Sequence, residues 1–256
     1  MSETTVNDEE FRERYGGMIG SGQSAVIYAR NGIAAKVYRE GQPKKQVYQE
    51  AFTLAVVRDS GIPAPDIYCV ETFHERTAVL MDHVRGDSLA DLIQKDPEKT
   101  EEYMDKIVSL QKEMHGIYTT EFRPLKLVLF GTIVASPGLK EDEKKRLSAM
   151  LETLPDGLSI CHGDFHGGNV LFDGKSYIII DWAEVACGAP AADACRSYMD
   201  FLIMNQEHAE MYLEKYCAAT GLSRDEILAW MPVTAGSLYG YLGSEAQEKI
   251  GPLFKN

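Results

Sequence analysis

Apolar and polar residues alternate along two segments in the first third of the chain. Residues 18–38 alternate on both sides of Asn31-Gly32, a dipeptide that favours a two-residue hairpin turn with positive φ. Residues 66–73 and 77–84 have a similar strand-like pattern. Between the two segments, apolar side chains keep roughly helical spacing from residue 44 until Gly61 and Pro63 end the helix. The pattern predicts an antiparallel five-stranded sheet with one helix over about the first 82 residues.

After Arg85-Gly86 the pattern becomes helical, apart from one strand-rich stretch over residues 158–182. Asp96 followed by Pro97 predicts a helix start, because proline is tolerated at the first helical position, and apolar residues then share one face as far as Ile117. Further helices are predicted over residues 139–154, 192–219, 223–235 and 244–254. The sequence therefore predicts an α+β fold with two lobes, residues 1–82 and 87–256, joined by a hinge at residues 83–86.

Composition limits the location and the partners of the protein. The first ten residues, MSETTVNDEE, lack the regions of a signal peptide and are expected to be a frayed terminus, and no apolar run reaches the length of a membrane span. We therefore expect a cytoplasmic protein without a membrane partner, and its five cysteines without C-x-x-C pairs are expected to be reduced thiols. The net charge of −13 disfavours nucleic acid and fits either a cationic substrate or an acidic, solvated surface.

A loop containing Gly20, Ser21 and Gly22, in the string GSGQSA, is the first candidate for nucleotide binding. The string alone would suit a dinucleotide-binding turn, a kinase loop or an ordinary loop. A dinucleotide-binding turn must lead into a helix, so that the pyrophosphate lies at the helix N-terminus. Here the following residues continue as strand, which favours a hairpin that folds over the phosphates of a nucleotide in a kinase.

A lysine and a glutamate give weaker support for the same interpretation. The string Ala34-Ala35-Lys36-Val37 resembles the kinase strand whose lysine holds the α and β phosphates. Glu50 follows fourteen residues later in the predicted helix, from which its carboxylate can reach Lys36. A single strand lysine is more often only solvated, so this pair is a hypothesis that depends on the catalytic motif.

The most specific motif is HGDFHGGN, residues 162–169, which is followed by IIIDW, residues 178–182. Phosphoryl transfer depends on positioned charge: one carboxylate faces the acceptor hydroxyl, and oxygen ligands hold a metal against the triphosphate. Asp164 is predicted to accept the hydroxyl proton. Asn169 and Asp181 are the predicted ligands of Mg²⁺, which prefers oxygen donors. His162 and His166 lack the further His or Cys residues that a zinc site needs.

Taken in order along the chain, GSGQS, AAKVY, QEAFTL, LMDHVRGDSL, HGDFHGGN and IIIDW resemble the aminoglycoside phosphotransferase and choline kinase superfamily, which is related to protein kinases. The resemblance implies a bilobal protein-kinase-like fold, with ATP or GTP bound between a nucleotide-binding lobe and a helical lobe that holds the catalytic loop and substrate site. It also implies that the hinge backbone at Met81, Asp82 and Val84 binds adenine and that His162 supports the catalytic loop. Asp193 is expected to hold that loop, although a position near a helix start explains this residue equally well.

Departures from protein kinases point to a small acceptor. Gly163 stands where protein kinases have arginine, and only eleven residues separate Asp181 from Asp193, too few for a long activation loop. We therefore expect a small hydroxylated acceptor such as an aminoglycoside, an amino alcohol or a sugar. The absence of an acidic and aromatic ending after Gly251 weighs against an aminoglycoside. A nucleotide-binding pseudokinase scaffold is the main alternative, and a protein kinase that acts on flexible tails is a third.

The residues after position 190 favour a cationic acceptor, because nine acids stand there against five bases, and six of the aromatic residues among them could add cation–π contacts. Solvated helix faces and core packing explain the same residues equally well. The acids and aromatic residues are Asp193, Asp200, Glu207, Glu210, Glu214, Asp225, Glu226, Glu245, Glu248, Tyr198, Phe201, Tyr212, Trp230, Tyr239 and Tyr241.

Overall fold

The computed structural model describes residues 3–22 and 24–255, and their side chains from residue 9 onward. The chain forms two compact units, the first containing Met1–Asp87 and Leu171–Ala183 and the second containing Ser88–Val170 and Glu184–Asn256. This division differs from the predicted lobes, because Leu171–Ala183 belongs to the first unit and not with the rest of residues 87–256. Its backbone is tied there by the N–H of Ile179, which donates to the carbonyl of Pro63 over 2.7 Å.

The first unit is built on a five-stranded antiparallel sheet, which confirms the sequence-based prediction. Asn31 and Gly32 connect two of its strands with φ values of 53° and 82°, the two positive values that a type I′ hairpin turn requires. The strands lie in the spatial order β1-β2-β3-β5-β4. They are β1 (Gly17–Ser21), β2 (Ala25–Arg30), β3 (Ile33–Tyr38), β4 (Ile67–Phe73) and β5 (Arg76–Asp82).

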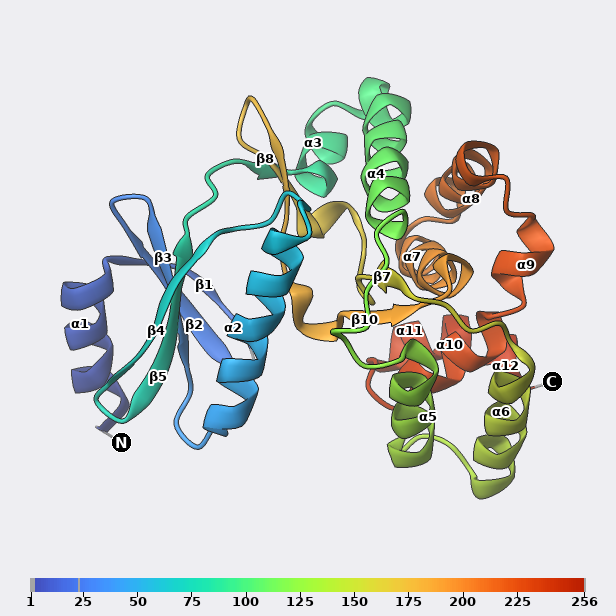
Figure 1. Ribbon diagram of the computed structural model, residues 1–256, viewed down its shortest axis with the longest axis horizontal. Helices are drawn as coiled ribbons and strands as arrows, with labels where there is room; N and C mark the ends of the chain where they lie inside the picture. Colours follow the sequence, from blue (N-terminus) through green and yellow to red (C-terminus); the bar gives the residue numbers. More distant parts are fainter. Residues whose placement is uncertain (1–2, 23, 256) are drawn as a thin grey trace. The chain divides into compact units, whose positions relative to one another are not determined.

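One helix covers each face of this sheet (Figure 1). Helix α1 (Glu3–Tyr15) packs Phe11 and Tyr15 on one face, and helix α2 (Lys44–Asp59) packs Val47 and Ala51 on the other. The expectation of a frayed first segment is therefore wrong. Phe11 and Tyr15 lie one helical turn apart just beyond the polar stretch, and burying this pair of rings stabilises the helix.

A short hairpin precedes the metal-ligand candidate Asp181. Strands β8 (Val170–Phe172) and β9 (Tyr177–Ile179) belong to a three-stranded sheet of order β6-β8-β9, in which β6 is Asp87–Ser88. The carboxylate of Asp173 accepts the backbone N–H groups of Lys175 and Ser176 and so fixes the turn of this hairpin. The 3₁₀ helix η3 (Trp182–Glu184) follows directly after Asp181.

The second unit is mainly helical, with α4, α7 and α8 packed together and α5, α6 and α10 packed together (Figure 1). Within the described ranges, no helix is long and apolar enough to cross a membrane. The helices are α3 (Leu89–Lys95), η1 (Pro97–Lys99), α4 (Thr100–His115), α5 (Leu125–Ala135), α6 (Glu141–Thr153), α7 (Pro190–Met204), α8 (Gln206–Thr220), α9 (Arg224–Leu228), α10 (Met231–Tyr239), α11 (Ser244–Ile250) and α12 (Pro252–Lys255).

The helix predictions are right in kind and wrong at several boundaries. The segment 192–219 is two helices, because Asn205 adopts an extended backbone and its side chain accepts the N–H groups of Glu207 and His208 at the start of α8. The segments 223–235 and 244–254 are also each divided in two, and Asp96 precedes a 3₁₀ turn instead of capping α4. Helix α5 is absent from the prediction, since LKLVLFGTIVA is apolar on every side and shows no helical period.

Candidate active site

Lys36 and Glu50 form an ion pair in the first unit, as the sequence predicts. The ammonium of Lys36 in β3 donates to Oε1 of Glu50 in α2 over 2.5 Å, and the hydroxyl of Tyr38 donates to the other carboxylate oxygen. The side chains of Lys36 and Glu50 are 19% and 23% exposed. Glu50 is thus held from two sides and fixes the Lys36 ammonium. No other hydrogen bond within the described residues uses this ammonium, so its remaining N–H donors are available to a ligand.

The predicted glycine loop connects β1 to β2, as a kinase hairpin requires, and no helix follows it. Gly20 and Ser21 are the last residues of β1, and the N–H of Gly22 donates to the carbonyl of Ala25 over 2.9 Å. The guanidinium of Arg39 donates to the carbonyl of Gly22 over 3.0 Å and to the hydroxyl of Ser21 over 3.1 Å. Arg39, which sequence reasoning did not select, therefore fixes one side of the loop; Gln23 at its tip lies outside the described residues.

The predicted adenine-binding residues differ in what their backbone can offer. Met81 and Asp82 are the last residues of β5, and the N–H of Asp82 already donates to the carbonyl of Asp66 over 2.9 Å. Val84 follows the end of the strand, and no hydrogen bond in the described part of the chain uses its N–H. Of these residues, Val84 is the one with a demonstrably free backbone donor.

Asp181 has an exposed carboxylate in an unusual backbone conformation. Its φ is 63°, in the left-handed region that aspartate enters more readily than most residues. The neighbouring indole of Trp182 is buried, and its N–H donates to the carbonyl of Ile179 over 3.0 Å. This bond joins the residues before and after Asp181 and so fixes the backbone at that position. Within residues 9–22 and 24–255, no hydrogen bond or ion pair uses the carboxylate of Asp181, so its oxygens remain available to a cation.

The catalytic motif forms a loop in the second unit between β7 (Ser159–Cys161) and the 3₁₀ helix η2 (Gly167–Asn169). Strand β7 pairs with β10 (Ala186–Gly188). Gly163 has a φ of 83°, and a Cβ atom there would lie 2.5 Å from the carbonyl oxygen of Glu184, so this position requires glycine. The fully buried His162 accepts the N–H of Asp164 at Nδ1 over 3.2 Å, which agrees with the supporting role expected of it.

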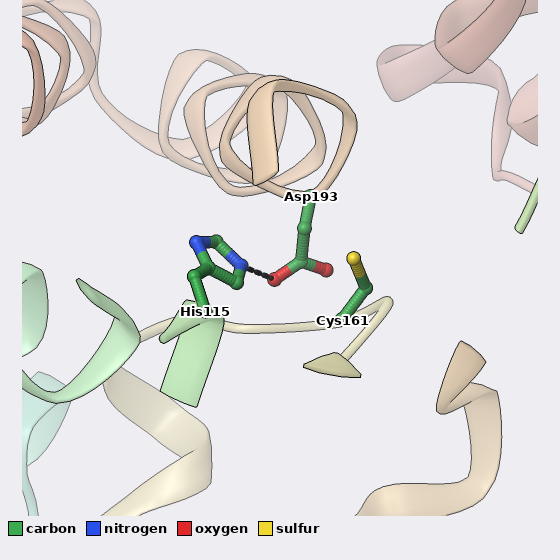
Figure 2. Close-up of side chains that lie close together, drawn as sticks. All are labelled: His115, Cys161 and Asp193. Atoms are coloured by element: carbon green, nitrogen blue, oxygen red, sulfur yellow. Dashed lines mark hydrogen bonds and ion pairs between the residues drawn. The ribbon is translucent and has the colours of Figure 1, made fainter. Parts of the chain in front are cut away.

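Asp193, near the start of α7, holds the same loop. Its Oδ1 accepts the N–H of Gly163 over 2.7 Å, while its Oδ2 accepts Nε2 of Gln111 over 3.0 Å and lies 2.9 Å from Nε2 of His115 (Figure 2). Burial raises the pKa of Asp193, but the bond to His115 and the other donors outweigh it and lower the pKa to about 2. Asp193 therefore acts as a buried anchor for the loop, as the resemblance implies.

His115, Cys161 and Asp193 lie close enough to suggest a metal site, with their ligand atoms within 4.8 Å of one another (Figure 2). Both oxygens of Asp193 are already engaged, and Nδ1 of His115 is 2.6 Å from the hydroxyl of Tyr216. Burial raises the pKa of the Cys161 thiol well above its ordinary value, so the sulfur remains protonated and is a poor metal ligand. His115 and Asp193 belong to the hydrogen-bond network that supports the loop, whereas the Cys161 thiol donates to the carbonyls of Ser159 and Ala189.

Asp164 is held on both sides of its carboxylate. Its Oδ1 accepts a hydrogen bond from Nη2 of Arg196 over 2.6 Å. Its Oδ2 is 3.3 Å from Nδ2 of Asn169, and the same nitrogen donates to the backbone carbonyl of Asp164 over 2.9 Å. The Asp164 side chain remains 31% exposed, so lone pairs of the carboxylate are left for a ligand. These bonds use the amide nitrogen of Asn169. Its amide oxygen is therefore left as a ligand atom that suits Mg²⁺.

Arg196 is a partner of Asp164 that sequence reasoning missed, and Asp200, expected only as part of an acidic surface, shares the same guanidinium. Arg196 donates through Nη1 to Oδ1 of Asp200, one turn further along α7, and the two side chains are 18% and 14% exposed. The other oxygen of Asp200 is buried and has no hydrogen bond in the described chain, and burial raises the pKa of Asp200 to about 6. Asp193, Arg196 and Asp200 are three and four residues apart, a spacing that places them on one face of a helix and is a readable signal.

The electrostatic environment keeps Asp164 ionised at neutral pH. Burial raises its pKa, but His166, Arg196 and His162 together hold it below the ordinary value of a carboxyl group. His166 lies 3.7 Å away from Oδ2 through Nε2, and attraction to Asp164 and Asp200 raises the pKa of its imidazole despite burial. Asp164 can therefore accept a hydrogen bond from a hydroxyl group at neutral pH, and it would take the proton late in a reaction.

A cavity of about 500 Å³ in the second unit opens on Asp164, and this volume suits a small molecule. Helix α5 supplies one part of the lining, and α10 and the residues after it supply another. The catalytic loop, η3 and α7 supply the rest. The lining residues are Leu125, Val128, Leu129, Thr132, Gly163, Asp164, Glu184, Ala192, Asp193, Arg196, Thr234, Ser237, Leu238 and Tyr241.

Most of the residues that favoured a cationic acceptor do not line this cavity. Of the nine acids only Asp193 does, and both of its oxygens are already bonded. Of the six aromatic residues only Tyr241 does, whereas Tyr198, Phe201, Tyr212 and Trp230 are buried in the core. These residues therefore give no support to a cation in this cavity, and core packing accounts for the four buried aromatic residues.

Solved structures with similar folds include aminoglycoside phosphotransferases and choline kinases. Aminoglycoside phosphotransferase APH(4)-Ia, as a thermostable mutant in ternary complex with AMP-PNP and hygromycin B, has a TM-score of 0.71 at 16% identity, and the match covers 97% of each chain. Choline kinase LicA from Streptococcus pneumoniae has a TM-score of 0.67 at 11% identity, covering 99% of this chain and 98% of its own. Aminoglycoside-3'-phosphotransferase of type VIII has a TM-score of 0.64 at 18% identity, covering 93% of this chain and 100% of its own. These matches confirm the kinase-like fold.

At the sequence level, no curated protein matches the chain significantly. The family model described as the phosphotransferase enzyme family does match, over residues 18–230. This range includes the glycine loop, the Lys36–Glu50 pair and the whole catalytic motif. The protein is therefore a member of the phosphotransferase enzyme family.

Proposed function

We propose that the protein transfers the γ-phosphoryl group of ATP or GTP to a hydroxyl group of a small acceptor bound in the cavity of the second unit. The geometry of Asp164 carries this proposal. Its ionised carboxylate is fixed by Arg196 and Asn169 and opens on a cavity of about 500 Å³. A positioned carboxylate of this kind orients a hydroxyl group for attack on phosphorus.

Each part of the proposed reaction has a residue in this chain with suitable chemistry. Asp164 accepts a hydrogen bond from the acceptor hydroxyl, and it receives the proton as the new oxygen–phosphorus bond forms and the bond to the leaving diphosphate breaks. Lys36, fixed by Glu50, offers its ammonium to phosphate oxygens. Gly20, Ser21 and Gly22 are proposed to cover the phosphates.

Adenine recognition and metal binding complete the proposal. The free N–H of Val84 is the proposed adenine contact, and Met81 and Asp82 hold the strand that leads to it. The amide oxygen of Asn169 and the exposed carboxylate of Asp181 are the proposed Mg²⁺ ligands. A bound Mg²⁺ would neutralise charge on the phosphate oxygens.

An acceptor panel tests the proposal directly. Nucleotide consumption and phosphorylated product are measured with ATP and with GTP over aminoglycosides, macrolides, amino alcohols and sugars, using wild-type protein and Asp164→Asn. We expect acceptor-dependent turnover that the substitution strongly lowers while nucleotide binding remains. Nucleotide binding with no acceptor-dependent turnover would support a pseudokinase scaffold. Protein bands that become labelled when a cell extract is incubated with the protein and labelled nucleotide would support a protein kinase.

A further inference from the structure

Helix α5 places apolar side chains beside the reacting carboxylate. Its one charged residue, Lys126, donates to the carbonyls of Glu152 and Leu154 and does not line the cavity. Val128 and Leu129 line the cavity together with Asp164, and Leu238 of α10 adds to this apolar lining. A helix that is apolar on every side is normally buried on every side. In α5, however, only Leu125 and Ile133 are fully packed, so an apolar surface is left for a ligand.

Most of the charged groups that line the cavity are already hydrogen-bonded within the protein. Asp164 is paired with Arg196, and Asp193 is bonded through both oxygens. Glu184 is exposed, and within the described residues its side chain has no hydrogen bond or ion pair. The cavity can therefore offer one free carboxylate to a ligand. Further ammonium groups would meet only apolar side chains or the hydroxyl groups of Thr132, Thr234, Ser237 and Tyr241, which do not neutralise their charge.

We infer that the acceptor is a hydroxylated molecule with a continuous apolar surface and at most one ammonium group. Its apolar surface packs on Val128, Leu129 and Leu238, and its hydroxyl group reaches Asp164. This inference rests on the proposed function for the group that is phosphorylated, whereas the binding of the apolar surface depends on the cavity alone. It also separates this protein from APH(4)-Ia, whose structure holds hygromycin B, since 16% identity carries over the fold and not the acceptor.

Alkyl glucosides provide the test, because methyl, butyl and hexyl glucoside share one hydroxylated head and differ only in apolar length. Their dissociation constants are measured by calorimetry on the full-length protein. We expect the affinity to rise about fourfold for each added methylene until the chain fills the cavity, the factor that corresponds to burial of one methylene. Hygromycin B serves as the polycationic comparison and should bind more weakly than hexyl glucoside.

Two leucines of α5 give a matched pair of variants. Leu129 lines the cavity, whereas Leu127 lies outside it and is 61% exposed. Leu129→Ala should weaken hexyl glucoside binding about tenfold or more, because it removes apolar contact area, and should leave nucleotide affinity unchanged. Leu127→Ala makes the same chemical change on the same helix and should alter neither affinity. Thermal unfolding of both variants shows whether they fold like the wild type.

The outcomes separate this inference from the proposed function. Affinity that does not depend on chain length, equal effects of the two leucine variants, or tighter binding of hygromycin B would overturn the inference. Binding that follows the expected pattern, without phosphoryl transfer to any acceptor of the panel, would support the inference and overturn the proposed function. Phosphoryl transfer to a polycationic acceptor, at a rate that Leu129→Ala does not change, would support the proposed function and overturn the inference.

Discussion

The two units hold their functional charges by different means. In the first, Lys36 and Glu50 form a one-to-one pair between a strand and the helix that follows it, and both side chains are about one-fifth exposed. In the second, one guanidinium, that of Arg196, lies between two carboxylates, those of Asp164 and Asp200. Asp164 comes from a loop 32 residues earlier in the chain.

This difference determines what each arrangement offers to a ligand. The first arrangement presents a cation whose partner is fixed, while the second keeps a net negative charge beside the cavity. Partly exposed ion pairs contribute little to stability, whereas breaking a largely buried network leaves an uncompensated charge and destabilises the fold. We therefore expect substitutions in the first unit to act mainly on nucleotide binding and substitutions around Arg196 to act on both catalysis and stability.

The largest effect is expected from Asp164→Asn. The amide keeps the size of the side chain but cannot accept the proton of the acceptor hydroxyl, so kcat should fall by roughly 10²- to 10⁴-fold while nucleotide affinity changes little. Steady-state turnover with a panel acceptor and calorimetric nucleotide binding measure the two quantities. Asp225→Asn, at an exposed carboxylate in α9, is the control and should match the wild type. Unchanged kcat in Asp164→Asn would remove Asp164 from the reaction.

Lys36→Met should have the next largest effect, and on a different quantity. Loss of the ammonium removes a charged hydrogen bond to phosphate oxygens, so nucleotide affinity should fall about 10- to 100-fold while the midpoint of thermal unfolding changes little. Lys45→Met changes an exposed lysine at the start of α2 and should alter neither. If the two variants bound nucleotide equally well, Lys36 would be only a surface partner of Glu50.

Asp200→Asn tests the charge balance of the second unit through pH. The folded-state pKa of Asp200, about 6, lies above the ordinary value of 3.8, so its contribution to stability is fully present below pH 3.8 and is lost as pH rises through 6. The pH dependence of the Asp193 contribution runs in the opposite direction. Because the pKa of Asp193 is about 2, its contribution to stability is present above pH 3.8 and is lost as pH falls through 2.

In Asp200→Asn, the unfolding free energy should therefore no longer fall between pH 4 and 7, where Asp200 lowers that of the wild type by about 1–3 kcal/mol. This range follows because one pKa unit corresponds to about 1.4 kcal/mol. The loss of stability below pH 4, which comes from Asp193, should remain. Urea unfolding at a series of pH values measures the difference between Asp200→Asn and the wild type. Parallel curves for the two proteins would show that Asp200 does not take up a proton in this range.

Arg39→Ala should have the smallest effect. Its guanidinium fixes the carbonyl of Gly22 and the hydroxyl of Ser21 through exposed hydrogen bonds, and such bonds are each worth about 0.5–1.5 kcal/mol. The KM for nucleotide should therefore rise about two- to tenfold with kcat nearly unchanged. Arg58→Ala, at the other end of α2 from the loop, provides the control. A fall in kcat larger than the change in KM would instead place Arg39 in the transfer step.

The sequence by itself determined the features that depend on local pattern. Alternation around Asn31-Gly32 determined the hairpin, helical spacing determined α2, and the distance from Lys36 to Glu50 allowed one strand–helix pair. The catalytic motif could be recognised because Asp164 and Asn169 lie five residues apart in HGDFHGGN. A loop this short leaves the two side chains few positions in which they do not meet. Register and helix period act over a few residues, so they are visible in the string itself.

Only the tertiary structure decided which distant groups complete the site. Arg196 reaches Asp164 because α7 packs beside the catalytic loop, and α5 lines the cavity although its uniformly apolar sequence shows no face. The same packing buries Phe201 and Trp230 and engages Asp193, which removes them from the acceptor surface that their types suggested. Composition gives the kinds of side chain in a segment, but burial and direction depend on what packs against it, and that is a property of the folded chain.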